Sequence, residues 1–213
     1  MNSGTPPRHI ALDTETSGLS AADELTSFYA VEFDIRSGAL GQALQLDFNP
    51  VVPISHFATQ KTGQTNAGQA KYPIISKTHC LDIAKFLKGG DVWIHNKPFD
   101  ERFIDKAMRR FGLAPVSSVS NLFCSIQRAR AVGHKDCKLD TLCDHYRIDR
   151  SSRSVHGARV DAELLAMVVS KMYPGAASTK STAGIRPSNP DPRVTAVRSD
   201  FSSLANLVRA RRT

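Results

Sequence analysis

The sequence predicts an α/β domain built on a mixed sheet that is flanked by helices. Two observations carry this prediction. Strand-like apolar runs dominate the first quarter of the chain, and segments with apolar residues three and four positions apart follow, on either side of one further short apolar run. With 213 residues, the chain is long enough for one such domain and an additional segment, but short for two full domains.

Three strands are expected in the first part of the chain. Residues 9–15 form an apolar run that ends in acidic residues, and residues 27–35 are rich in aromatic and β-branched side chains. Residues 43–48 alternate between polar and apolar side chains and could pair with the second strand. Residues 49–72 contain proline, glycine and many polar residues with little periodicity, so a long loop or covering segment is expected there.

The middle of the chain predicts a helix, a short strand and a second helix. Residues 78–88 place their apolar side chains mainly on one side and end at a Gly-Gly pair. Residues 91–95 form a short buried strand, and residues 99–111 repeat apolar side chains at helical spacing up to Gly112.

Three more helices are expected after this point, over residues 121–131, 139–146 and 156–172. The last of them is closed by Pro174-Gly175, so we expect the domain to occupy residues 1–173.

The net charge of +8 is concentrated behind this domain. From residue 174 onward, seven Lys and Arg residues accompany two Asp residues, a net charge of +5. Residues 174–200 predict a flexible linker, and residues 201–213 a short basic helix or tail that could contact a protein partner. A basic balance suits a polyanionic partner, but it suits a solvated tail equally well, so charge alone identifies no function.

The composition excludes several classes of protein. No apolar run approaches the roughly 18 residues of a membrane span, and the first residues do not resemble a signal peptide. No membrane partner is therefore expected, and the cytoplasm is the expected location. The four cysteines form no CxxC pair and predict no disulfide framework, and their spacing with nearby histidines does not match the usual zinc patterns.

The first chemical signal lies at the end of the first strand, where Asp13 and Glu15 stand two residues apart. Residues two apart on a strand point to the same side of the sheet, so these carboxylates project together. Two adjacent negative charges repel one another unless a cation lies between them. A solvated acidic turn would give the same sequence, so the pair alone does not establish a metal site.

Two weaker signals follow. Asp100 lies in the first turn of the helix after the 91–95 strand, where ordinary capping and the helix dipole also favour Asp. His156 and Asp161 are five residues apart at the start of the last helix, and they can face one site if regular helix begins just after His156. Neither pattern is specific on its own.

In this order and separation, the three segments resemble the motifs of the DnaQ-like, or DEDDh, family of 3′→5′ exonucleases, particularly its epsilon-type proofreading branch. The resemblance includes Gly18, the run IHNKPFD at 94–100, LDTLCDHYRID at 139–149 and HGARVDAELLA at 156–166, and it spans residues 9–172. Five functional positions in the correct chain order, within matching local context, make this resemblance specific.

The resemblance implies a fold, a reaction and a set of site residues. The fold is a ribonuclease H-like mixed sheet of about five strands, three antiparallel and then parallel ones, flanked by helices. The reaction is metal-dependent hydrolysis that releases nucleoside 5′-monophosphates from 3′ ends, with two divalent cations, Mg²⁺ or Mn²⁺. His156 would be the general base. The metal ligands would be Asp13, Glu15, Asp100 and Asp161, and the substrate-binding residues Thr16, Gly18 and Asn96. Apart from the resemblance, four basic residues are candidates for following the phosphates behind the terminus, although an ordinary solvated basic loop would give the same sequence: Arg128, Arg130, Lys135 and Lys138.

Among possible substrates, 3′ ends of single-stranded or frayed DNA are favoured. A 3′→5′ exoribonuclease stays an alternative, because related families with the same five residues act on RNA. An inactive nucleic-acid-binding subunit associated with a polymerase is disfavoured, since all five residues are present.

Two segments depart from the family's pattern. The second strand of epsilon-like proteins usually carries an acidic residue followed by Ile-Gly, where this chain has TSFYA at 26–30. The family's His-Gly-Ile segment, which helps to shape the pocket for the terminal nucleotide, has no clear equivalent, and residues 57–63 are expected to take its place. These departures bear on the choice of substrate and not on the metal chemistry.

Overall fold

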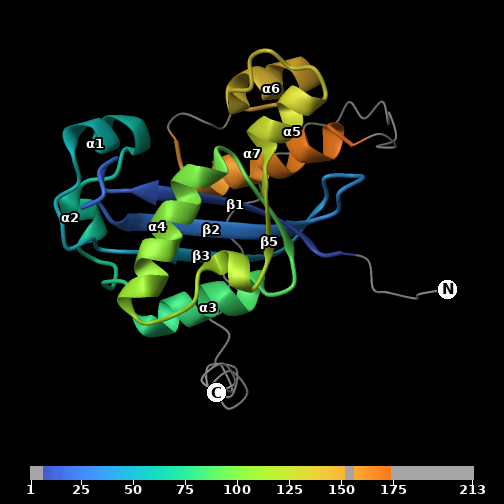
Figure 1. Ribbon diagram of the computed structural model, residues 1–213. Helices are drawn as coiled ribbons and strands as arrows, with labels where there is room; N and C mark the ends of the chain where they lie inside the picture. The colour runs from blue at the N-terminus through green and yellow to red at the C-terminus, as the bar shows by residue number, and fades with distance from the viewer. Residues whose placement is uncertain (1–6, 152–155, 174–213) are drawn as a thin grey trace, which may run out of the picture.

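The computed structural model describes residues 7–151 and 156–173, which form a mixed sheet with helices on both faces (Figure 1). The order across the sheet is β3-β2-β1-β4-β5. The strands are β1 (His9–Thr16), β2 (Leu25–Phe33), β3 (Leu40–Asp47), β4 (Asp91–Ile94) and β5 (Asn121–Cys124). The first three pair antiparallel, β4 runs parallel to β1, and β5 runs parallel to β4. The prediction of a five-stranded mixed sheet, antiparallel and then parallel, is confirmed.

β1 occupies the centre of the sheet because both of its faces are apolar. Ile10, Ala11 and Leu12 are fully buried, with Ile10 and Leu12 in one core and Ala11 in the other. A continuous apolar run is typical of a strand that is covered on both faces. Leu12 lies opposite Ile94 in the parallel pairing with β4. The carboxyl ends of β1 and β4 therefore lie side by side, at the same end of the sheet.

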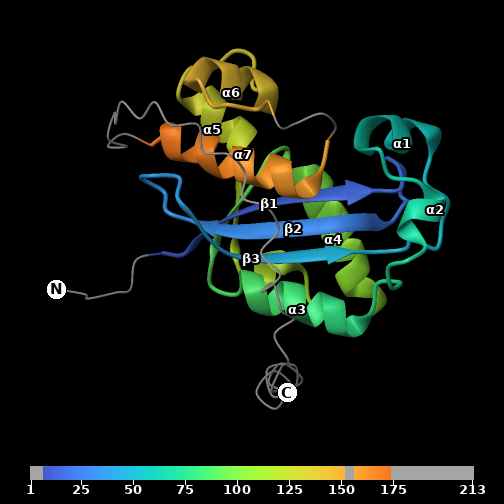
Figure 2. The same cartoon turned by 180° about the vertical axis from the view of Figure 1, so that it is seen from behind.

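Helices form a layer on each face of the sheet. Their bounds are α1 (His56–Thr62), α2 (Asn66–Gln69), α3 (Lys77–Leu87), α4 (Lys97–Arg110), α5 (Ser125–Ala131), α6 (Leu139–Tyr146) and α7 (Ala158–Lys171), with a 3-10 turn at Val116–Ser118. Helices α3 and α4 cover one face, while α7 covers the other with α5 and α6 beside it (Figures 1 and 2). None of these helices is long and apolar enough to cross a membrane.

The prediction of one helix over residues 121–131 is wrong, because residues 121–124 form β5 and only residues 125–131 are helical. β5 is the outermost strand of the sheet, and its residues Asn121 and Phe123 are exposed. Because so few of its side chains are buried, the sequence shows no apolar pattern that would predict a strand. Its backbone groups are satisfied by pairing with β4, about 30 positions earlier in the chain. This long-range pairing decides the conformation.

The expectation of a long loop over residues 49–72 is also wrong in part, because α1 and α2 lie within it. A hydroxyl side chain starts each helix: Ser55 accepts a hydrogen bond from the backbone of Ala58, and Thr65 from that of Gly68. Helix α1 buries only Ala58, so no apolar period marks it in the sequence. The predicted segments 174–200 and 201–213 lie outside the described residues.

Candidate active site

Three carboxylates converge at the end of β1. Asp13 and Glu15 point to one side of the strand, and Asp161 comes from the first turn of α7. Oxygen atoms of the three side chains lie within 4.8 Å of one another. Three hard oxygen donors at this separation suit a divalent cation, which removes the repulsion between them.

Small residues on α7 let that helix lie close to the sheet. Ala158, Ala162 and Ala166 recur every fourth position, so they share one face of the helix, and all three are buried in the core that also contains Ala11 of β1. Since α7 packs closely on β1, Asp161 in its first turn reaches the carboxylates at the end of the strand. The helix dipole also favours a negative charge in that turn.

Asp100 approaches the same place from α4. It is 2% exposed, and its Oδ1 accepts hydrogen bonds from the backbone N–H of Thr14 at 3.0 Å and from the Thr14 hydroxyl at 2.7 Å. Burial raises the pKa of Asp100 to about 7, against the hydrogen bonds from Thr14, which lower it. Because both bonds go to Oδ1, the other oxygen, Oδ2, is the one that could turn toward a cation.

His156 lies just before α7, as its proposed role requires. Its side chain is 47% exposed, and Nδ1 lies 3.1 Å from Oδ2 of Asp161. Its backbone N–H donates to the carbonyl oxygen of Lys61 at 3.0 Å, which ties the segment to α1. An imidazole that donates to Asp161 through Nδ1 carries its lone pair on Nε2, the atom that can accept a proton.

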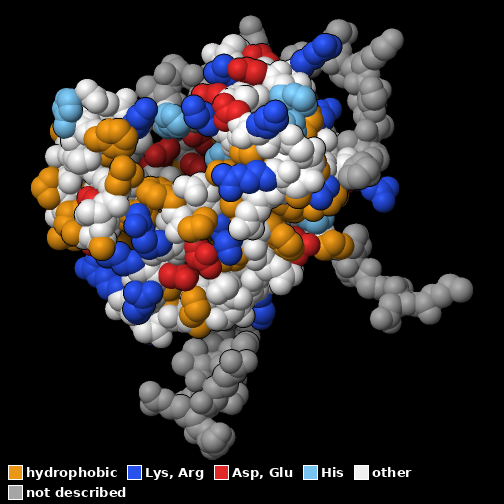
Figure 3. Space-filling view, turned by 45° about the horizontal axis from the view of Figure 1, so that its top comes forward, with side chains coloured by type: hydrophobic (Ala, Val, Ile, Leu, Met, Phe, Trp, Pro, Cys, Tyr) orange, Lys and Arg blue, Asp and Glu red, His pale blue; other side chains and the backbone are white. Residues whose placement is uncertain are grey.

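A cavity of about 340 Å³ joins these groups. The ends of β1, α1 and α4 and the segment before α7 all contribute to its wall. Acidic side chains lie at the bottom of a hollow whose rim carries basic and histidine side chains (Figure 3). The residues that line the cavity are Asp13, Thr14, Glu15, Thr16, Gly18, Leu19, Phe57, Ala58, Lys61, Thr62, His95, Phe99, Asp100, His156 and Asp161.

Two of the three expected substrate-binding residues line this cavity. The Thr16 hydroxyl donates to the carbonyl oxygen of Gly18 at 2.7 Å and closes the turn. A Cβ atom at Gly18 would lie 2.6 Å from the carboxylate of Asp23, so a larger residue here would displace the Asp23 side chain. The third residue, Asn96, precedes α4 in the left-handed conformation with φ of 59°. It is not among the lining residues of the described chain, whereas the preceding residue, His95, is.

Three residues that line the cavity are not among the predicted site residues: Leu19, His95 and Phe99. His95 and Phe99 lie on either side of Asn96 within the 94–100 run, and Leu19 follows Gly18 directly. Their proximity to motif residues was the available signal. Which of them face the cavity depends on how β1 and α4 lie against each other.

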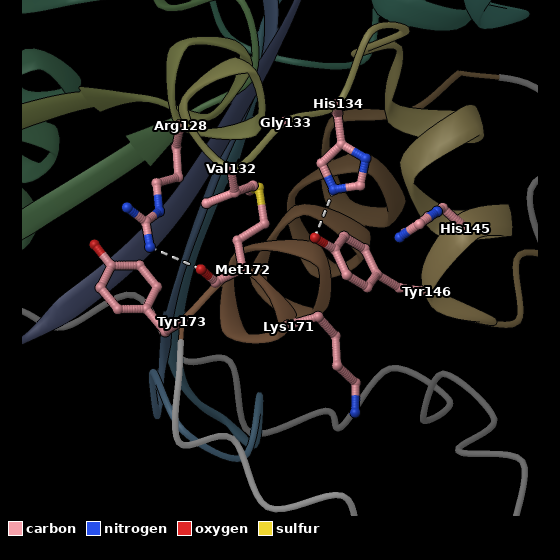
Figure 4. A pocket seen from close by; sticks show the side chains of 9 residues that line it. All are labelled: Arg128, Val132, Gly133, His134, His145, Tyr146, Lys171, Met172 and Tyr173. Atoms are coloured by element: carbon pink, nitrogen blue, oxygen red, sulfur yellow. Dashed lines mark hydrogen bonds between the residues drawn. The ribbon is translucent and has the colours of Figure 1, made fainter.

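A second cavity, of about 370 Å³, lies at the opposite end of α7 (Figure 4). Arg128 donates from Nη2 to the carbonyl oxygen of Met172 at 2.8 Å, and its guanidinium carbon lies 4.7 Å from the centre of the Tyr173 ring. Nε2 of His134 lies 2.7 Å from the hydroxyl of Tyr146. Arg128, one of the residues expected to follow the substrate phosphates, is thus engaged in holding the end of α7.

Comparisons with known proteins identify the relatives of this chain. The family model described as exonuclease matches residues 10–169. The epsilon subunit of DNA polymerase III from Haemophilus influenzae is 32% identical over 180 residues, which are 80% of this chain and 69% of that protein. The same subunit from Pasteurella multocida is 31% identical over 183 residues, 81% of this chain and 71% of that protein. A crystal structure of E. coli exonuclease I with a dA16 oligonucleotide has a TM-score of 0.66 at 16% identity, covering 77% of this chain and 40% of that one.

Proposed function

This chain belongs to the exonuclease family, and on that premise we propose that it removes nucleoside 5′-monophosphates one at a time from the 3′ ends of DNA. Single strands and frayed ends are the proposed substrates, with Mg²⁺ or Mn²⁺ as the two divalent cations. The observation that carries the proposal is the convergence of Asp13, Glu15 and Asp161 with His156 on one cavity.

DNA is proposed over RNA because of the relatives. The matched curated proteins are named as subunits of a DNA polymerase, and the matched exonuclease I holds a DNA oligonucleotide. The basic segment after residue 173, with its net charge of +5, is proposed to contact a protein partner and not to take part in hydrolysis.

In the proposed reaction, the chain holds the 3′-terminal phosphodiester against its acidic cluster. Asp13, Glu15 and Asp161 would hold one cation, and Asp100 together with Asp13 the other. When bound, divalent cations make water more acidic and neutralise the negative charge that develops on the phosphate. His156 would accept the proton of the attacking water at Nε2, with Asp161 orienting the imidazole through Nδ1. A bond from the water oxygen to phosphorus forms, and the bond from phosphorus to the 3′ oxygen of the preceding nucleotide breaks.

The residues near Asp13 would position the terminal nucleotide. The turn closed by Thr16 and Gly18 presents backbone on the cavity wall, where it could approach the terminal sugar closely. For Asn96 we propose a supporting role: its left-handed conformation starts α4 and so directs Asp100 toward the site.

The proposal is tested with 5′-labelled oligonucleotides of one sequence, offered as single-stranded DNA, duplex DNA and RNA in Mg²⁺ or Mn²⁺. We expect stepwise shortening of single-stranded DNA with release of nucleoside 5′-monophosphates, and no cleavage of a circular single strand. Faster shortening of RNA would replace the proposed substrate with the alternative one. If none of the substrates were shortened in a metal-dependent way, the proposal that the protein is an exonuclease would be rejected.

His156→Ala separates the general base from the metal site. We expect kcat to fall by about 100-fold or more, since a positioned general base contributes roughly 10²–10⁴ in rate. The rise in melting temperature on addition of Mn²⁺ should persist, because all four carboxylates stay in place. Equal turnover by this variant and the wild type would remove His156 from the mechanism.

A further inference from the structure

Helix α1 forms a fixed wall of the catalytic cavity. The backbone N–H of Ser55 donates to the carbonyl oxygen of Ser17 at 2.7 Å, which joins the start of the helix to the end of β1. Gly63, in the left-handed conformation with φ of 72°, ends the helix. The carbonyl of Lys61 accepts the hydrogen bond from His156. This wall is thus connected to the segments that carry the carboxylates and the histidine.

Lys61 is the lysine among the residues that line this cavity. In the described part of the chain its ammonium group makes no hydrogen bond or ion pair, and it lies 5.8 Å from the centre of the Phe57 ring. A cation held near an aromatic face is weakly stabilised there. The side chain is exposed, whereas Asp100 and Asp161 are buried, so Lys61 lies nearer the mouth of the cavity than the acids do.

Other basic side chains near the cavity are already engaged. Arg102 donates to the carbonyl oxygen of Leu19 at 3.2 Å. Lys106 donates to three carbonyl oxygens of the neighbouring loop, at 2.7–2.8 Å. These groups hold the loop that follows β1. The ammonium of Lys61 is therefore the better candidate for contact with a substrate.

We propose that Lys61 binds the phosphate that follows the scissile one on its 5′ side, at the mouth of the cavity. This inference rests on the proposed function, which places the scissile phosphate at the buried carboxylates. A strand that leaves the carboxylates must pass through the mouth, where its next phosphate meets a cation on the facing wall. The compact, flexible lysine side chain suits such a contact with a phosphate.

The structure offers a matched set of variants. Lys61→Met removes the charge but keeps an unbranched side chain of good helix propensity, and the carbonyl that holds His156 is unchanged. Lys61→Arg restores the charge. Lys71→Met is the control, because Lys71 is also exposed and lies 4.9 Å from the centre of an aromatic ring, that of Tyr72, but does not line the cavity.

Kinetics with two substrates, one with and one without a second phosphate, show which phosphate Lys61 contacts. Relative to wild type, Lys61→Met should raise KM for a single-stranded oligonucleotide about tenfold and leave kcat within about twofold. The slope of log KM against log salt should fall by about 0.7, the value for one phosphate contact on a single strand. Activity on the p-nitrophenyl ester of thymidine 5′-monophosphate, which has no second phosphate, should not change. Lys61→Arg should recover most of the affinity, and Lys71→Met should match the wild type.

Loss of activity on the ester as well as the oligonucleotide would place Lys61 at the scissile phosphate and overturn the assignment. Equal KM values and salt slopes for Lys61→Met and Lys71→Met would remove the contact altogether. A binding measurement tests the Lys61 contact separately from the proposed exonuclease activity. It compares the affinity of the Asp161→Asn protein for a fluorescent oligonucleotide with that of the Asp161→Asn, Lys61→Met double variant. A tenfold loss of affinity there supports the contact even if no hydrolysis is found, and equal affinities reject it even if hydrolysis is found.

Discussion

The two ends of helix α7 lie in oppositely charged surroundings. At its start, Asp161 faces Asp13, Glu15 and the His156 ring. At its end, Arg128 donates to the carbonyl oxygen of Met172, and Lys171 and two histidines line the neighbouring cavity. Both arrangements match the helix dipole, which favours negative charge at the start of a helix and positive charge at its end.

The difference lies in how each charge is compensated. At the end of α7, the guanidinium of Arg128 meets a carbonyl oxygen and an aromatic ring, so attraction within the protein accounts for its place. At the start, the helix dipole accounts for one carboxylate, but two more from β1 lie within 4.8 Å of it. Crowding of like charges is unfavourable without a cation. The candidate site therefore differs from the second cavity because it holds like charges close together despite their repulsion. The presence of charged groups alone does not distinguish the two cavities.

Asp161→Asn should have the largest effect of the variants that test this difference. Removal of one ligand should lower kcat/KM by about 10³-fold, on the order of the several kcal/mol that a metal ion contributes to the transition state. It should also abolish the rise in melting temperature that Mn²⁺ gives the wild type, since a ligand stabilises only a protein that binds it.

Without added metal, Asp161→Asn should melt no lower than the wild type, because relief of the repulsion among three crowded carboxylates offsets the weaker helix-dipole interaction, and the introduced asparagine can still accept the hydrogen bond from Nδ1 of His156. Calorimetry with and without Mn²⁺ measures both quantities. A variant that melts well below the wild type in the absence of metal would mean that Asp161 stabilises the apoprotein, which would contradict the argument from crowding.

Arg128→Ala tests the other end of the helix. Loss of its hydrogen bond to the Met172 carbonyl and of its contact with the Tyr173 ring should lower the free energy of unfolding by roughly 2 kcal/mol. Turnover and oligonucleotide KM should not change. Arg130→Ala is the control: this exposed residue lies in the same last turn of α5, and its substitution should change the free energy of unfolding by less than about 0.5 kcal/mol.

Urea unfolding and oligonucleotide kinetics of the two arginine variants show whether Arg128 stabilises the end of α7 or contacts the substrate. If Arg128→Ala raised KM while leaving stability intact, the second cavity would contact nucleic acid, and the original expectation that Arg128 follows the phosphates would be favoured.

The parts of the fold with strong periodicity could be predicted from the sequence. The apolar run of β1 and the helical spacing of α4 and α7 depend mainly on residues within each element. β5 could not be predicted in this way, because its conformation depends on pairing with β4 at the sheet edge. Helix α1 also escaped prediction, since it buries one residue and is defined by its caps.

Some features of the candidate site could likewise be predicted from the sequence, and others could not. That Asp13 and Glu15 project together follows from the alternation of a strand. That Asp100 would be buried against Thr14, or that Lys61 would hold the backbone of His156, does not follow from either segment alone. These contacts join residues more than 80 positions apart, so they depend on how the elements pack.

Tyr29→Phe tests the middle of α7, between the two ends, and should have the smallest effect. The Tyr29 hydroxyl donates to Oε1 of the buried Glu163 at 3.0 Å, and Arg159 donates to the same oxygen at 2.9 Å. Because Glu163 keeps its arginine partner, loss of the tyrosine bond should cost about 1 kcal/mol at neutral pH. The metal-induced rise in melting temperature should persist, since no carboxylate at the start of the helix changes.

The pH dependence gives this variant a sharper signature. Burial and then the negative charge of Glu163 raise the pKa of Tyr29 above its ordinary value of 10.0. Above about pH 10 the unfolded chain loses this proton while the folded chain keeps it, so the wild type should lose roughly 1.4 kcal/mol per pH unit relative to Tyr29→Phe. Urea unfolding of both proteins from pH 8 to 11 should show the advantage of the wild type shrinking and then reversing. Parallel curves across that range would show that the buried Glu163 does not hold the tyrosine protonated. The stability of the centre of α7 would then not depend on the charge of its side chains, unlike that of either end of the helix.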